Sequence, residues 1–331
     1  MKTDDDPSEN TPTPSSDNES ESRRQRSGLI PNIGELSKAR LNMMVLGTTA
    51  VGFALADPDL PAMKLFWTLV GTALTAASAG MLNQLAEIRP DGLMKRTRER
   101  PLPAGLVSPR TVFVLGVLLT YAGATILGML VNGISCMLAL LNVLIYVLVY
   151  TPLKPRTTLN TLVGAICGAI PPMIGWVAAT GRLDGGAWLL GTLLFVWQLP
   201  HFFALAMMYR EDYERGGFAM LPVVDNRGEI TVQVILVTSL CLIPIGLGAT
   251  LIGLAGWFSA LMALLLGIMM SLLALILYIK RTHVAARRVF LGSLAYLPLA
   301  LGAMVIDSGP IEVDDAPTFT EPMNPHGMIA P

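Results

Sequence analysis

Nine apolar segments, each long enough to cross a lipid bilayer, constrain this chain more than any other feature of its sequence. Only 14% of its residues are charged and its mean hydropathy is +0.57, whereas a soluble domain carries about 25% charged residues. The sequence therefore predicts an all-α integral membrane protein with nine transmembrane helices. The expected spans are 41–57, 65–88, 111–131, 133–150, 158–179, 187–208, 230–252, 255–279 and 289–306.

Basic residues are distributed unevenly between the loops. Fifteen Lys and Arg residues lie in the loops that follow the even-numbered spans, and only Lys64 and Arg182 lie in the others. Cytoplasmic loops carry the excess of Lys and Arg in membrane proteins. We therefore expect the N-terminus and the basic loops in the cytoplasm and the C-terminus outside, in a multi-pass protein of the bacterial inner membrane.

Two polar tails flank the predicted transmembrane domain, which covers residues 38–308. Residues 1–37 begin as a Ser-, Asp- and Glu-rich stretch that has too little apolar surface to fold, so a mostly disordered cytoplasmic tail is expected. Residues 309–331 are expected to form a second disordered tail. No cleaved signal peptide is expected, and the net charge of −1 predicts no nucleic-acid role.

A row of oxygen-bearing side chains follows the second span. Asn83, Glu87 and Asp91 are spaced four apart, so on a helix they share one face. Pro90 disfavours helical geometry at Arg89, where the helix is expected to loosen or end. Carboxylates at membrane depth are costly and usually functional.

A second acidic group, Glu211 and Asp212, ends the sixth span. Both spans run from outside to inside, so the two groups are expected at one membrane depth, where they could face each other. Carboxylates alone would repel a phosphate, but Mg²⁺ takes oxygen ligands and bridges carboxylates to phosphates. Neighbouring Arg and Lys side chains can neutralise the outer phosphate oxygens. The pattern favours a lipid diphosphate as ligand, with a solvated loop that anchors the bundle as the alternative.

The sequence alone does not decide the role of several other residues. Lys154 and Arg156, between the fourth and fifth spans, are equally consistent with phosphate or carboxylate binding and with ordinary positive-inside anchors. His201 lies within the sixth span beside Pro200. A hydrogen-bonded interior histidine is the favoured interpretation there, with an iron ligand, a base or a substrate contact as alternatives. The glycines of the fifth span (Gly164, Gly168 and Gly175) favour close helix packing over a wall shaped for a flat ligand.

These motifs resemble the UbiA superfamily of intramembrane prenyltransferases. Its first signature is similar to the row from Asn83 to Asp91 followed by Met94-x-Arg96-Thr97-x-x-Arg100-Pro101-Leu102. Residues 77–84, 150–161, 171–176 and 200–202, with Arg210-Glu211-Asp212-Tyr213 and the Gly216–Pro222 stretch, resemble the heme O synthases within that superfamily. The likeness covers residues 35–300.

The resemblance implies a nine-helix bundle around a central cavity. It implies transfer of the farnesyl group of farnesyl diphosphate to a vinyl group of heme B, with Mg²⁺ as cofactor and heme O as product on the way to heme A. The lipid bilayer surrounds the protein, and heme A synthase is an expected partner. The metal and catalytic candidates are Asn83, Glu87, Asp91, Glu211 and Asp212. The candidate substrate-binding residues are Arg96, Arg100, Lys154, Arg156, Tyr150, His201 and Arg210.

Two rival functions are kept. Another UbiA-type prenyltransferase could act on a different aromatic or chlorin acceptor, and the segments resembling heme O synthases weigh against it. A transporter built from repeats would bind its substrate near the membrane midplane. The charges of this chain gather at one end instead, with His201 as the exception.

Overall fold

The computed structural model describes residues 34–36, 39–56, 59 and 61–308 of the chain. Every regular element within those residues is helical. The predicted tails lie outside the described residues except for a helical turn at 34–36. In that turn Leu36 is buried and its carbonyl accepts a hydrogen bond from Gln84 Nε2 at 2.8 Å.

The helices are α3 (Ala39–Ala56), α4 (Ala62–Ala86), α5 (Ile88–Leu93), α6 (Pro109–Leu130), α7 (Gly133–Leu144), the π-helix η1 (Ile145–Tyr150), α8 (Thr151–Leu153), α9 (Asn160–Thr180), α10 (Gly185–Met208), α11 (Arg210–Arg215), α12 (Leu221–Val224), α13 (Glu229–Leu251), α14 (Trp257–Lys280) and α15 (His283–Ile306). Within the described residues, eight helical runs are long and apolar enough to cross a membrane, and α7, η1 and α8 form one of them. The apolar part of α3, Leu41–Ala56, is a shorter ninth. The predicted all-α membrane fold is confirmed.

The largest difference from the predicted spans is at the start of α15. The sequence places this span at 289–306, but the helix begins at His283. Thr282 provides the reason, because its hydroxyl accepts the backbone N–H of Ala285 at 3.2 Å and caps the helix. His283 is therefore part of a helix end rather than of a loop.

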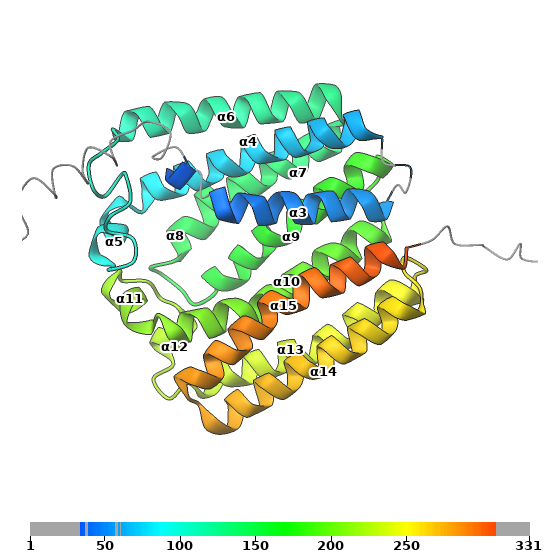
Figure 1. Ribbon diagram of the computed structural model, residues 1–331. Coiled ribbons are helices and arrows are strands. Elements are labelled where there is room, and N and C mark those ends of the chain that lie inside the picture. Colours follow the sequence, from blue (N-terminus) through cyan, green and yellow to red (C-terminus); the bar gives the residue numbers. More distant parts are fainter. Residues whose placement is uncertain (1–33, 37–38, 57–58, 60, 309–331) are drawn as a thin grey trace, which may run out of the picture.

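The long helices form two groups that meet at α9 and α10 (Figure 1). One group contains α3, α4, α6, α7 and α9, and the other contains α10, α13, α14 and α15. α9 and α10 are the most buried of the eight candidate spans. The larger apolar core lies in the second group, around residues such as Leu193, Met270 and Tyr296.

Gly175 sets the close approach of α9 to α3. A Cβ atom at this position would lie 1.9 Å from the carbonyl oxygen of Thr49 on α3. A residue without a side chain is required at such a crossing, so the packing interpretation applies to this glycine.

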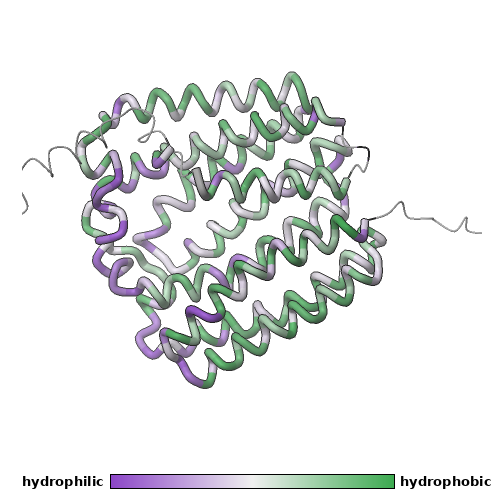
Figure 2. Tube along the Cα trace, in the orientation of Figure 1, coloured by the Kyte–Doolittle hydropathy of each residue, from purple (hydrophilic) through white to green (hydrophobic). Residues whose placement is uncertain are grey.

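The short helices α5, α11 and α12 gather at one end of the bundle (Figure 1). Hydrophilic residues concentrate at the same end, whereas the helices between the two ends are mostly hydrophobic (Figure 2). The two acidic groups that follow α4 and α10 therefore lie at the same end of the molecule, as their positions in the sequence suggest.

Candidate functional site

A break between α4 and α5 shapes the first acidic group. α4 ends at Ala86, and α5 begins directly after Glu87, which has φ −101° and ψ 14°. The sequence suggested a break at Arg89, but the break occurs two residues earlier. A proline ring collides with the carbonyl group of the residue four positions before it. For Pro90 that residue is Ala86, so the helix ends there. The row continues across the break, since the Asp91 N–H donates to the Glu87 carbonyl at 2.8 Å.

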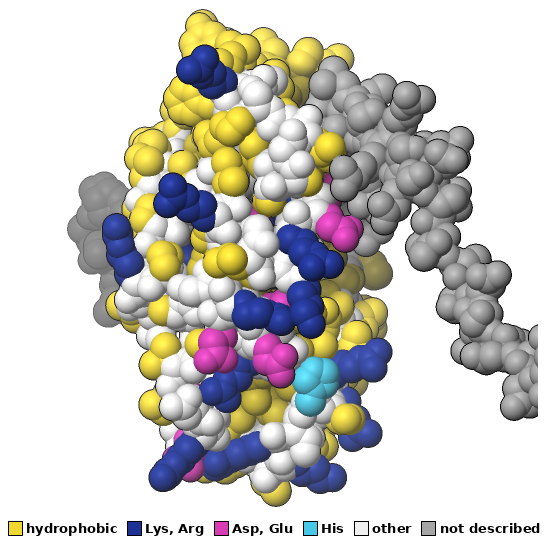
Figure 3. Space-filling model, turned by 90° about the vertical axis from the view of Figure 1, so that its left-hand side faces the viewer, with side chains coloured by type: hydrophobic (Ala, Val, Ile, Leu, Met, Phe, Trp, Pro, Cys, Tyr) yellow, Lys and Arg dark blue, Asp and Glu magenta, His cyan; other side chains and the backbone are white. Residues whose placement is uncertain are grey.

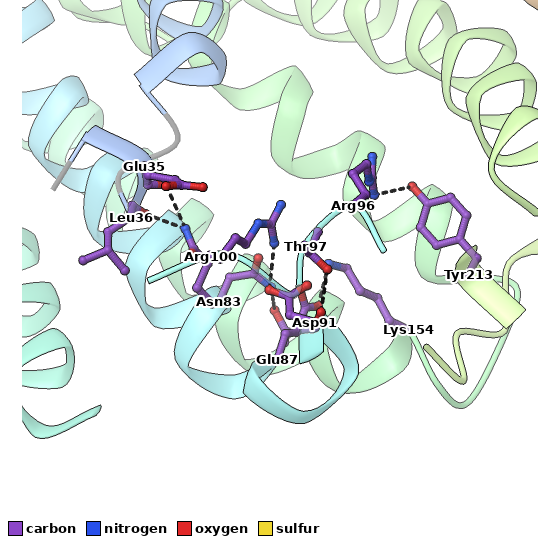
Figure 4. Close-up of polar contacts among 12 residues, drawn as sticks. Glu35, Leu36, Asn83, Glu87, Asp91, Arg96, Thr97, Arg100, Lys154 and Tyr213 are labelled. Atoms are coloured by element: carbon purple, nitrogen blue, oxygen red, sulfur yellow. Dashed lines mark hydrogen bonds and ion pairs between the residues drawn. The ribbon is translucent and has the colours of Figure 1, made fainter. Parts of the chain in front are cut away.

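Asn83, Glu87 and Asp91, here called the first acidic cluster, are almost inaccessible, with 0, 5 and 1% of their surface exposed. Glu87 Oε1 lies 2.6 Å from Lys154 Nζ. Asp91 Oδ2 accepts a hydrogen bond from Arg100 Nη1 at 2.7 Å (Figure 4). Buried carboxylates require such partners because leaving one unpaired costs several kcal/mol. Two of the predicted diphosphate-binding cations thus lie against the two predicted carboxylates.

Hydrogen bonds connect this cluster to the π-helix η1. Asn83 Nδ2 donates to Thr151 Oγ1 at 2.9 Å, and Thr151 Oγ1 donates to the Tyr146 carbonyl at 2.8 Å. That carbonyl also accepts the backbone N–H of Thr151, which is the i to i+5 bond of a π-helix. The rings of Tyr146 and Tyr150, 5.1 Å apart, both line the central cavity.

Lys154 connects three parts of the site. Its Nζ lies 4.5 Å from the ring centroid of Tyr150, and its carbonyl accepts the N–H of Ala219 at 2.7 Å. Burial by itself would lower the pKa of Lys154, but attraction to the Glu87 carboxylate outweighs it and raises that pKa. The ammonium group is therefore kept charged beside the cavity.

The second acidic group lies on α11. Asp212 is buried and forms an ion pair with Arg215, whereas Glu211 is exposed. Asp212 borders an open groove of about 480 Å³ at this end of the molecule. The groove is lined by Lys95, Met207, Met208, Tyr209, Arg210, Glu211, Asp212, Arg215 and His283. Figure 3 shows Lys and Arg side chains spread across this face, with few acidic ones among them.

Arg96 joins the segment after α5 to α11. Its Nη2 donates to the Tyr213 hydroxyl at 3.5 Å (Figure 4). Its guanidinium also lies 5.2 Å from the ring centroid of Tyr209 and 5.5 Å from that of Tyr213. Met94 packs with Phe218 and the residues around it in a small apolar cluster. These contacts hold the two acidic groups in a common framework.

A cavity of about 230 Å³ runs from this framework into the bundle. Its charged end is marked by Tyr150, which contacts Lys154, and by Tyr213, which contacts Arg96. Most of its wall is apolar or aromatic. The lining residues are Leu41, Asn42, Val45, Ala76, Ala79, Gly80, Asn142, Tyr146, Tyr150, Thr161, Gly164, Cys167, Gly168, Pro171, Gln198, Phe202, Leu205, Tyr213 and Met220.

Gly164 and Gly168 give this cavity its shape. A Cβ atom at Gly164 would lie 2.8 Å from Cε2 of Tyr150, and one at Gly168 would lie 2.0 Å from Oε1 of Gln198. Both glycines therefore allow close packing, which is the interpretation that the sequence favoured, and both also line the cavity.

Of the predicted substrate-binding residues, Tyr150 belongs to the cavity lining, Arg96 and Lys154 contact lining residues, and Arg100 pairs with Asp91. Arg156, Arg210 and His201 are not among the lining residues either. Arg156 is exposed, and Arg210 borders the open groove and donates to Asn226 Oδ1 at 3.0 Å. His201 faces α15, where its Nδ1 lies 2.8 Å from Ser293 Oγ. This geometry matches the hydrogen-bonded interior histidine that the sequence favoured.

The donors of the first acidic cluster suit Mg²⁺, because they are carboxylate and amide oxygens. Among the described residues, no three His, Cys, Asp or Glu side chains converge in a metal-binding arrangement. Instead Glu87, Asp91 and Asp212 are each paired with a basic side chain.

Sequence reasoning missed several residues of the site. Tyr146, Thr151 and Gln198 belong to the cavity or its support. Tyr146 and Tyr150 stand four apart in an apolar span, and this spacing could have indicated a shared face. Gln198 gave no comparable signal, because its position in the cavity depends on the packing of α10 against α9.

Comparison with known sequences identifies relatives over most of this chain. The model of the UbiA prenyltransferase family matches residues 45–297. The protoheme IX farnesyltransferase of Solibacter usitatus (strain Ellin6076) is 38% identical over 283 residues, which are 82% of this chain and 97% of the relative. The human mitochondrial protoheme IX farnesyltransferase is 39% identical over 288 residues, which are 87% of this chain and 65% of the relative.

Solved structures share the fold. A UbiA homolog from Archaeoglobus fulgidus bound to DMAPP and Mg²⁺ has a TM-score of 0.61 at 17% identity, covering 83% of this chain and 99% of that one. A digeranylgeranylglyceryl phosphate synthase has a TM-score of 0.72 at 13% identity, covering 84% of this chain and 98% of that one.

Proposed function

Because this chain belongs to the UbiA prenyltransferase family, we propose that it transfers the farnesyl group of farnesyl diphosphate to a vinyl group of heme B, giving heme O and diphosphate. The relatives named protoheme IX farnesyltransferase support the choice of both substrates. The observation that carries the proposal is the pairing of buried carboxylates with cations at the charged end of an otherwise apolar cavity.

The diphosphate lies at the charged end of the cavity. Lys154 is buried beside Glu87 and Arg100 is half-buried beside Asp91, so they can contact phosphate oxygens with little reorganisation. Arg96 supplies a third cation from the same segment. Asn83, Glu87, Asp91, Glu211 and Asp212 are the candidate ligands of Mg²⁺. A Mg²⁺ ion held by these residues would supply positive charge that offsets the charge of the departing diphosphate.

The prenyl chain occupies the apolar part of the cavity. Departure of diphosphate breaks the bond between oxygen and C1 of the farnesyl group and leaves an allylic cation. Tyr150 lies at this end with Tyr146 beside it, and aromatic faces attract cations. The walls around them keep water away from the cation until the vinyl carbon attacks it.

The vinyl group of heme B then forms the new carbon–carbon bond. The terminal vinyl carbon bonds to C1 of the farnesyl group, and the positive charge moves to the carbon next to the porphyrin. The oxygen of a water molecule bonds to this carbon, and the water loses one proton. The overall reaction is that heme B, farnesyl diphosphate and water give heme O, diphosphate and a proton. Heme A synthase, which would take the product further toward heme A, is the expected partner.

The protein acts in a bacterial inner membrane, with the charged end in the cytoplasm. The Lys and Arg side chains spread over the end formed by α5, α11 and α12 support this orientation (Figure 3). The N-terminus then lies in the cytoplasm and the C-terminus outside, and farnesyl diphosphate enters from the cytoplasmic side.

The proposal is tested with the purified full chain, heme B, farnesyl diphosphate and Mg²⁺, with products separated by mass spectrometry. Formation of heme O that requires both substrates and Mg²⁺ is the expected result. Prenylation of 4-hydroxybenzoate, with none of heme B, would instead favour another UbiA-type acceptor. Uptake into proteoliposomes without product would favour a transporter.

A further inference from the structure

Gln198 places a polar side chain in the wall of the central cavity. The residue lies in the middle of α10 and only 5% of its surface is exposed, yet it is one of the residues that line the cavity. Burying a polar group without hydrogen-bond partners is costly. The contacts at each end of this amide therefore show what the side chain is suited to do.

The nitrogen of the amide is fully engaged. Nε2 donates to the carbonyl of Leu194 at 3.0 Å and to that of Ala165 on α9 at 3.5 Å. Both partners are carbonyl oxygens, which only accept hydrogen bonds, so the amide cannot be turned over. Oε1, in contrast, receives no hydrogen bond from any residue that the structure describes. The amide oxygen is thus held in one direction with its lone pairs unused.

This oxygen lies at the cavity wall beside Gly168. A Cβ atom added to that glycine, which also lines the cavity, would lie 2.0 Å from Oε1. Among the described residues, Asn142 also carries an amide oxygen without a partner in this wall, but that Oδ1 atom is completely buried, as Oε1 of Gln198 is not. The cavity of about 230 Å³ has room for water at Oε1, since one molecule needs only about 15 Å³.

Two glycines of α9 give the depth of Oε1 in the cavity. Gly164 meets the ring of Tyr150, which contacts Lys154 at the charged end. Gly168, which meets Oε1, is four residues further along α9, toward the interior of the bundle. Four residues of a helix rise about 6 Å. The amide oxygen therefore lies about one helical turn deeper than the tyrosine ring that marks the charged end.

We propose that Oε1 of Gln198 holds the water molecule that completes the proposed reaction. The inference rests on the proposed function, in which bond formation at C1 of the farnesyl group leaves a positive charge on the heme carbon next to the porphyrin. The water donates one O–H to Oε1, and a lone pair of its oxygen forms the bond to that carbon. Its other proton then passes to the released diphosphate, which acts as the base.

The depth of Gln198 keeps this water away from the first cation. Reacting atoms must come within about 3.5 Å of each other, and diphosphate leaves C1 at the charged end, about one turn from Oε1. The second cation is centred two bonds away from C1. A vinyl group that approaches C1 from the deeper side of the cavity therefore carries the second cation toward the water and not the first.

The test compares the products of the wild type and of Gln198→Met, each as the purified full chain with heme B, farnesyl diphosphate and Mg²⁺. Methionine has a similar length but is a much weaker acceptor. Without the held water, the second cation should lose a proton from the adjacent carbon and give an alkene that is lighter than heme O by one water. Mass spectrometry measures both products.

We expect the ratio of alkene to heme O to rise at least about tenfold in Gln198→Met, through the loss of one hydrogen bond. The sum of the two products should form at nearly the wild-type rate, because the carbon–carbon bond forms before water adds. A residue that served packing alone would change that sum and leave the ratio as it was.

Gln84→Met is the matched control. Gln84 is also buried in a helix, and its Nε2 likewise donates to two main-chain carbonyls, those of Glu35 and Leu36, but it is not one of the residues that line the cavity. This variant should keep the wild-type ratio. If Gln198→Met does not fold, Gly168→Ala replaces it, because the new Cβ displaces Oε1 and should raise the ratio as well.

An unchanged ratio in the folded variant would overturn the proposal. A fall in both products at constant ratio would also overturn it, because it would indicate a packing role or a direct contact with heme. An equal rise in Gln84→Met would do the same. A wild type that prenylates no heme would refute the proposed reaction and this inference with it, so the wild-type product distinguishes the two failures.

Discussion

Glu87 and Lys154 form an ion pair of 2.6 Å between the segment after α4 and the segment after α8, and only 6% and 11% of their side chains are exposed. The pair therefore holds two distant segments of the chain together at the charged end of the cavity and keeps Lys154 in its charged form.

The first prediction concerns the stability of this pair. Lys154→Met leaves the Glu87 carboxylate buried without its cation, and we expect a loss of about 3 kcal/mol or more, seen as a lower melting temperature in detergent. The double variant Glu87→Gln/Lys154→Met should recover much of that loss while remaining inactive. If the stability lost in the double variant equals the sum of the losses in Glu87→Gln and in Lys154→Met, the two residues do not interact directly.

The second prediction concerns the pH dependence of the same pair. Burial alone would lower the pKa of Lys154, but Glu87 raises it in the folded protein. The contribution of the lysine to folding stability is therefore complete below its pKa in the unfolded chain. That contribution is lost as the pH rises through its pKa in the folded protein. The difference in melting temperature between wild type and Lys154→Met should therefore stay constant from about pH 7 to about pH 9. It should narrow only in stronger alkali. A narrowing near neutral pH would show that the lysine titrates there.

The third prediction separates the carboxylates of the site from other acidic residues. Asp91→Ala and Asp212→Ala should each lower heme O formation by at least about a hundredfold, because loss of a metal ligand removes several kcal/mol of charge stabilisation. Membrane insertion should be unaffected. Glu214→Gln, on the exposed side of α11, is the control and should remain active. Near-normal turnover in either Asp variant would remove that residue from the metal site.

The fourth prediction concerns the cavity wall. Gly168→Ala should push the Gln198 side chain into the cavity, because the new Cβ would lie 2.0 Å from its Oε1. We expect weaker binding of the prenyl substrate with little change in expression. Gly302→Ala, where a Cβ meets nothing within 4 Å, should leave binding unchanged. Equal substrate affinity in both variants would show that this wall does not contact the substrate.

The fifth prediction concerns orientation in the membrane. In a background without the native cysteines, an impermeant thiol reagent applied outside should label Arg182→Cys and should not label Glu99→Cys. Both positions are exposed. Glu99 follows α5, and Arg182 lies between α9 and α10, which meet at the end of the bundle opposite α5 (Figure 1). The reverse pattern of labelling would overturn the orientation inferred from the basic residues.

The sequence by itself determined the transmembrane architecture. Apolar length predicts a spanning helix from local composition alone, and the unequal distribution of Lys and Arg identifies the charged end. The spacing of Asn83, Glu87 and Asp91 also predicted a shared face, and the row persists across the break at Glu87. These properties depend on residues within a few turns of one another, so no knowledge of the packing was needed.

Only the tertiary structure decided which charges meet and which way the interior polar groups face. The pairing of Glu87 with Lys154, the support of η1 by Asn83 through Thr151, and the orientation of His201 toward Ser293 each join separate helices. Helix packing sets these contacts through the rotation of each helix about its axis. A helix such as α10 carries apolar residues on every side, so the periodicity of its sequence does not indicate which face meets the cavity and which meets α15.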